Sequence, residues 1–83
     1  MARVFTTEFL FNLRHYKVIV VMHDTNDGLH VRVRFLDAYH LIKNDSIEFV
    51  GLKGYKNLNT LQPEAMAFLE ELSKAIINHL SNN

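Results

Sequence analysis

Hydrophobic and polar residues alternate through much of the first half of the chain, with the two-residue period of β-strands that bury one face. The clearest alternation predicts a strand over residues 29–36, in which four apolar side chains face one way and His30, Arg32 and Arg34 face the other. Residues 3–12 alternate likewise and carry phenylalanine at three positions of one face. Both segments therefore predict strands that turn one side toward a core.

Two further segments predict strands with different patterns. Residues 16–23 are rich in β-branched side chains and are apolar on both faces, which is typical of a central strand covered on each side. Residues 46–52 place Ile47 and Phe49 toward the core and Glu48, Val50 and Leu52 on the opposite face.

The turn-forming residues 24–28 predict a hairpin between the second and third strands. Pairing Asp24 with Leu29 gives a four-residue loop in which Gly28 supplies a positive φ. The same register keeps every core-facing side chain of one strand opposite a core-facing side chain of the other. A shift by one residue would mix the two faces, so the hydrophobic pattern supports this register.

The hydrophobic period lengthens to that of a helix over residues 63–80. Pro63 suits the first helical position, where its missing N–H is not needed. The centre of the apolar stripe consists of Ala65, Leu69, Leu72, Ile76 and Leu80. Phe68 and Ala75 flank the stripe on one side, and Met66 and Ile77 flank it on the other. The stripe spans roughly 200°, wider than the ~100° that one sheet contact requires.

The element order β-β-β-β-α predicts an α+β fold: a four-stranded antiparallel β-meander followed by one C-terminal α-helix packed on one sheet face. With 83 residues, we expect residues 1–83 to form a single domain. The predicted core contains Phe9, Val18, Val20, Val31, Val33, Phe35, Phe49, Leu69, Leu72 and Ile76. A domain this small has a limited core, so a partner surface would stabilise it.

Composition removes several functional classes. The chain has no cysteine, which excludes disulfides, thiolate metal ligands and a cysteine nucleophile. Its formal net charge is zero, so it has no overall attraction to nucleic acid or to anionic membranes. The longest apolar run, residues 18–22, is far shorter than the roughly 20 residues of a membrane span. We therefore expect no membrane partner and a cytoplasmic location.

Catalytic and cofactor-binding patterns are also missing from the sequence. It contains no phosphate-binding loop, no nucleophile elbow and no converging pair of carboxylates, so we predict no enzyme activity, no catalytic residues and no cofactor. The predicted register places His23 beside His30, a pair that could share a metal ion. Half-exposed polar residues at a hairpin end are the commoner explanation, and no metal site is predicted.

The sheet face opposite the helix mixes apolar and charged side chains. The sequence places on it Val4, Leu10, Ile19, Val21, Val50 and Leu52, interspersed with Glu8, Lys17, Arg32, Arg34 and Glu48. Apolar residues with arginines among them are common at protein interfaces. We therefore predict a small non-enzymatic binding module, acting by self-association as a homodimer or as an inhibitor or accessory protein bound to a protein partner.

The candidate interaction residues fall on two surfaces. Those on the sheet are Lys17, Ile19, Val21, His23, His30, Arg32 and Arg34, and those on the helix flank are Met66 and Ile77. The alternative function is single-stranded nucleic-acid binding through Lys17, Arg32 and Arg34. That alternative is weakened because the aromatic side chains needed to stack on bases face the core.

Overall fold

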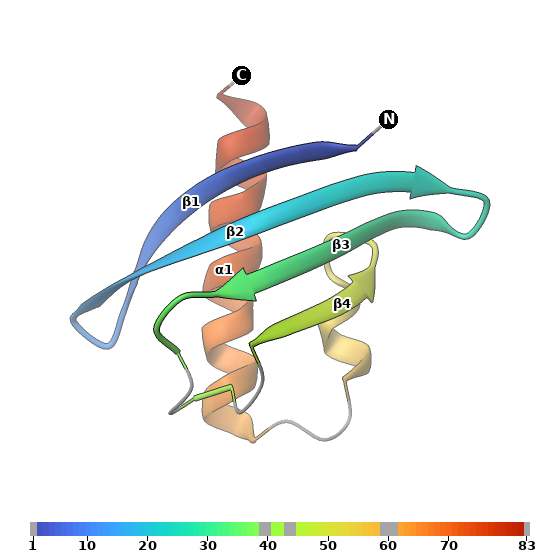
Figure 1. The fold of residues 1–83 in the computed structure, drawn as a ribbon. Coiled ribbons are helices and arrows are strands. Elements are labelled where there is room, and N and C mark those ends of the chain that lie inside the picture. The colour runs from blue at the N-terminus through green and yellow to red at the C-terminus, as the bar shows by residue number, and fades with distance from the viewer. Residues whose placement is uncertain (1, 39–40, 43–44, 59–61, 83) are drawn as a thin grey trace.

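The computed structural model describes residues 2–38, 41–42, 45–58 and 62–82. Four antiparallel strands form one sheet in the order β1-β2-β3-β4, and one C-terminal helix packs on that sheet (Figure 1). The elements are β1 (Arg3–Phe11), β2 (Arg14–Thr25), β3 (Gly28–Phe35), β4 (Ser46–Val50), the short 3-10 helix η1 (Gly54–Asn57) and α1 (Pro63–Ser81). The α+β meander predicted from the sequence is confirmed.

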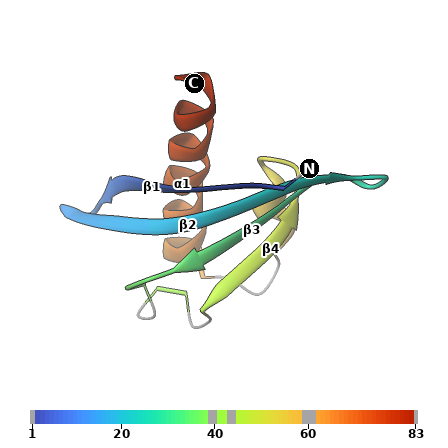
Figure 2. The ribbon, with the colours of Figure 1, turned by 45° about the horizontal axis from the view of Figure 1, so that its top comes forward.

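The helix α1 lies across a single face of the sheet, and no helix among the described residues lies over the other face (Figures 1 and 2). The helix starts at Pro63, after Gln62 in an extended conformation, and Glu64 and His79 lie in its first and last turns. The negative charge of Glu64 in the first turn complements the helix dipole. We call the helix-covered side of the sheet the inner face and the opposite side the outer face.

The core forms between α1 and the inner face. Every residue of the predicted core is buried except Phe9, which packs against the core while partly exposed. Phe68 is fully buried, and its ring lies 4.9 Å from that of Tyr16 and 5.1 Å from that of Phe9, centroid to centroid. The predicted core did not include Phe68, which lies at a flank of the helical stripe but is buried because aromatic rings from three strands converge on it.

The predicted β2–β3 register is confirmed, since Asp24 pairs with Leu29. The loop is shorter than predicted, however, because Thr25 also pairs with Gly28. The Thr25 hydroxyl accepts a 3.1 Å hydrogen bond from the Asp27 N–H and donates a 3.2 Å one to the Gly28 carbonyl. Gly28 has a φ of 125°, which a side chain would disfavour.

The segment after β4 differs from its prediction. The strand ends at Val50, and Gly51 turns the chain with a φ of 85°. Leu52 then packs, partly buried, against the core, and its carbonyl accepts a 2.9 Å hydrogen bond from the Ser73 hydroxyl of α1. The placement of Leu52 on the outer face was therefore wrong, because the turn redirects the chain before residue 52.

The substitution Leu72→Ala is expected to lower the free energy of unfolding by about 2–5 kcal/mol, because Leu72 is 1% exposed and its removal leaves a cavity. Urea denaturation measures the change. A loss below about 1 kcal/mol would contradict the burial of Leu72 between α1 and the sheet.

The substitution Leu13→Gly is expected to raise the free energy of unfolding by about 0.5–1 kcal/mol. Asn12 and Leu13 form the β1–β2 turn with φ values of 51° and 65°, and Leu13 is 96% exposed, so its side chain adds strain without burial. Leu13→Ala is the matched control, because alanine keeps the strain, and it should give no gain. Equal stabilisation by both substitutions would contradict this account.

Stability is expected to fall at alkaline pH through Tyr55. Burial raises the pKa of the Tyr55 phenol above its ordinary value of 10.0, the charge of Glu70 raises it further, and Lys74 partly opposes the shift. The unfolded chain therefore loses the phenol proton at a lower pH than the folded protein does. The free energy of unfolding keeps its full value below pH 10.0 and falls as the pH rises from there through the folded-state pKa. Urea midpoints measured from about pH 8 to about pH 11 should fall less in Tyr55→Phe than in the wild type. Parallel declines would contradict the assignment.

Candidate functional site

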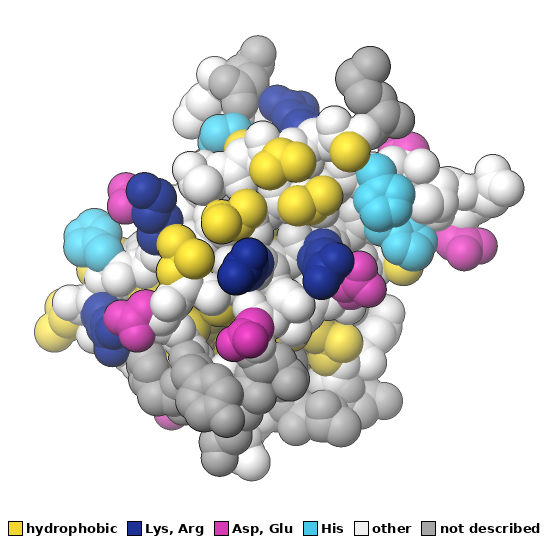
Figure 3. All heavy atoms as spheres, viewed as in Figure 1, with side chains coloured by type: hydrophobic (Ala, Val, Ile, Leu, Met, Phe, Trp, Pro, Cys, Tyr) yellow, Lys and Arg dark blue, Asp and Glu magenta, His cyan; other side chains and the backbone are white. Residues whose placement is uncertain are grey.

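The outer face collects side chains from all four strands. Its residues, each at a position that alternates with an inner-face position, are Val4, Thr6, Glu8, Leu10, His15, Lys17, Ile19, Val21, His23, His30, Arg32, Arg34, Ser46, Glu48 and Val50. Val4, Leu10 and Val50 are 64%, 52% and 45% exposed. Apolar side chains gather over the centre of this face, with cationic and acidic side chains beside them (Figure 3). These residues share one face because successive side chains along each strand point to opposite faces of the sheet.

Strand pairing sets the geometry at the centre of the face. Val21 lies between Val4 on β1 and Arg32 on β3. Two residues further along the same strands, Ile19 on β2 pairs with Arg34 on β3. Arg32 pairs in turn with Glu48 on β4. An apolar strip on β1 and β2 therefore borders a charged strip on β3 and β4.

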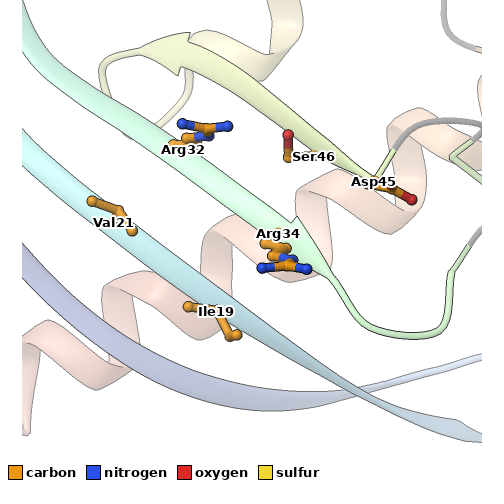
Figure 4. Close-up of a pocket in the computed structure, with 6 residues that line it drawn as sticks. All are labelled: Ile19, Val21, Arg32, Arg34, Asp45 and Ser46. Carbon is orange, nitrogen blue, oxygen red and sulfur yellow. The ribbon is translucent and has the colours of Figure 1, made fainter.

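A depression of about 570 Å³ lies where these strips meet. Its lining residues are Ile19, Val21, Arg32, Arg34, Asp45 and Ser46 (Figure 4). Within the part of the chain that the structure describes, the side chains of Arg32 and Arg34 form no hydrogen bond and no ion pair. Arg14 differs, since it pairs with Asp37 and lies 5.2 Å from the centre of the Tyr16 ring. Arg32 and Arg34 thus keep their donors for a ligand.

The other interaction residues that the sequence predicted on the sheet lie around this depression. Lys17 pairs with Glu8 across β1 and β2, which sets opposite charges side by side. His23 and His30 stack at the far end of β2 and β3, with ring centroids 5.4 Å apart. The Nε2 atom of His30 is buried without a hydrogen-bond partner among the described residues. Across those same residues, no group of three or more potential ligands is placed to hold a metal ion.

The predicted helix surface lies apart from the outer face. Met66 packs, partly buried, against the core, and Ile77 is half-buried on the same helix. The helix α1 lies on the inner side of the sheet (Figure 2). Met66 and Ile77 belong to α1, so they do not join the seven predicted residues of the outer face. The structure therefore brings together one of the two predicted surfaces and takes part of the other into the core.

Asp45 and Ser46 line the depression although the sequence did not mark them as site residues. The register that brings β4 beside β3, with Ser46 opposite Arg34, places them there. The long connection before β4 left this register open, because a loop of that length does not fix the pairing of the strands it joins. In the sequence, only the alternation within residues 46–50 indicated that Ser46 faces the same side as Glu48.

Comparisons with known proteins find no matching family model, no matching curated protein and no matching solved structure. In the described ranges, no helix combines the length and hydrophobicity needed to cross a lipid bilayer.

Proposed function

We propose that this protein is a small non-enzymatic binding module, located in the cytoplasm, that acts through protein–protein contacts made by its outer face. The observation that carries the proposal is the pair Arg32 and Arg34, which lie beside Ile19 and Val21 on an uncovered sheet face. Protein interfaces combine an apolar centre with arginine in this way. The binding partner is another protein or a second copy of the chain.

The arrangement favours a partner that carries carboxylates next to apolar side chains. Each arginine stem can pack on a branched neighbour, Arg32 on Val21 and Arg34 on Ile19, while its guanidinium reaches solvent. A guanidinium binds a carboxylate through two parallel hydrogen bonds. Covering the surrounding apolar side chains would exclude water and strengthen those bonds.

Single-stranded nucleic-acid binding is the second candidate, because Lys17, Arg32 and Arg34 share the outer face. Sequence-tolerant binders of single strands add aromatic side chains on which bases stack. Here the phenylalanine and tyrosine side chains of the described strands lie on the inner face, and the outer face carries histidine rings such as His23 and His30 instead. The inner-face residues are Phe5, Phe9, Phe11, Tyr16, Phe35 and Phe49. The formal net charge is also zero, so this candidate ranks second.

The double charge reversal Arg32→Glu with Arg34→Glu tests the proposal. Protein association, measured as self-association by sedimentation or as recovery of co-purifying proteins, should weaken by more than ~2 kcal/mol, because a desolvated ion pair is lost. The matched control is Lys53→Glu with Lys56→Glu, which makes the same charge change at exposed positions outside this face. Association that does not depend on Arg32 and Arg34 would contradict the proposal.

A single-stranded oligonucleotide in the same experiment distinguishes the second candidate. Binding that falls with salt at about 0.7 logarithmic units per phosphate contact, and that Arg32→Glu with Arg34→Glu abolishes, would favour nucleic acid over protein. We expect no such binding at physiological salt.

A further inference from the structure

The edge strand β1 is long, and in the described part of the chain no other strand lies along its free side. It pairs with β2 on one side only, and it extends over nine residues. It contains no proline or lysine, two residues that commonly prevent an edge from accepting another strand, and its charged residues are Arg3 at the start of the strand and Glu8. The edge therefore has the properties of a template for strand addition.

The turn geometry identifies which backbone groups point outward. A two-residue turn with positive φ at both positions closes on a hydrogen-bonded pair, which here is Phe11 and Arg14. Hydrogen-bonded and non-bonded pairs then alternate along the strands. The N–H and C=O groups that point away from β2 therefore belong to Val4, Thr6, Glu8 and Leu10. Among the described residues, no backbone hydrogen bond joins these groups to a segment beyond the sheet.

The helix turns this edge into a groove. The C-terminal part of α1 projects past β1 (Figures 1 and 2), and a groove of about 470 Å³ lies between strand and helix. The strand side of the groove is residues 7–10, and the helix side includes Lys74, Asn78 and Asn82. An added strand would have β1 beside it and a polar helix surface beneath it.

We propose that an extended segment of a protein partner adds antiparallel to β1 as a fifth strand seated in this groove. Its outer-face side chains are apolar where they adjoin the exposed Val4 and Leu10, and between these two positions they meet Thr6 and Glu8. Its side chains on the helix side are small and polar, because they meet Lys74 and Asn78. This surface is distinct from the depression at Arg32 and Arg34, although an added strand would extend the outer face.

The projecting helix disfavours a second copy as the occupant. Antiparallel pairing of two β1 edges about a two-fold axis places both helices on the same side of the joined sheet. Each α1 already extends past its own edge, so the two C-terminal ends would compete for the space under the shared edge. The phenylalanines of a second β1 would also meet the polar surface around Asn78. A single extended segment has neither conflict.

A synthetic peptide of alternating threonine and valine tests the proposal. With valine on the outer face, the valine N–H groups bond to β1 and the threonine N–H groups point away. A peptide N-methylated on its threonines should therefore bind, and one N-methylated on its valines should not. Amide hydrogen exchange should slow at Thr6 and Glu8 when the first peptide is added, and stay unchanged at Thr7. Equal effects of the two peptides, or none at about 1 mM, would overturn the proposal.

Two variants locate the binding site. Thr6→Pro removes one outward N–H, and Asn78→Trp fills the groove without altering β1; each should weaken peptide binding roughly tenfold or more. Arg32→Glu with Arg34→Glu should bind the peptide like the wild type, so failure here and failure of the proposed outer-face function are distinguishable. If Thr6→Pro and Asn78→Trp bind the peptide as tightly as the wild type does, the peptide does not occupy the groove beside β1. Protection of β1 amides that grows with protein concentration alone would show that a second copy is the occupant.

Discussion

The packing of a single helix on one face of the sheet determines the rest of this structure. Phe68 lies at its centre, fully buried among aromatic rings from β1, β2 and β3. Because side chains alternate along each strand, fixing the inner face also fixes which residues point outward. Arg32, Arg34 and their apolar neighbours lie on the outer face for that reason.

The same constraint links the fold to its proposed binding surfaces. A domain of this size buries a limited fraction of its apolar surface, and α1, the one long helix of the described residues, already packs on the inner face. The outer face is left with exposed Val4, Leu10 and Val50 beside two arginines that have no partner among the described residues. The helix also runs past β1, so the edge that it leaves unpaired becomes one wall of a groove. Both surfaces follow from where α1 crosses the sheet.

Features set by local periodicity could be predicted from the sequence. The four strands, the helix and the β2–β3 register follow from alternation and from the helical spacing of apolar residues, and the outer-face positions of Arg32 and Arg34 follow from them. Features set by the meeting of distant segments could not. Phe68 is central because rings from three strands converge on it, and Leu52 turns inward after Gly51. The groove beside β1 depends on where α1 crosses the sheet. The sequence patterns of β1 and α1 do not indicate that position.

Solvent exposure of neighbouring methyl groups tests the one-sided packing of the sheet most directly. Val20 and Val21 adjoin on β2, yet Val20 is 0% exposed on the inner face, while Val21 lines the depression of the outer face. A soluble paramagnetic agent added to dilute protein should broaden the methyl signals of Val21 and Val4 strongly and leave those of Val20 and Val18 sharp. Equal broadening of Val20 and Val21 would contradict the account.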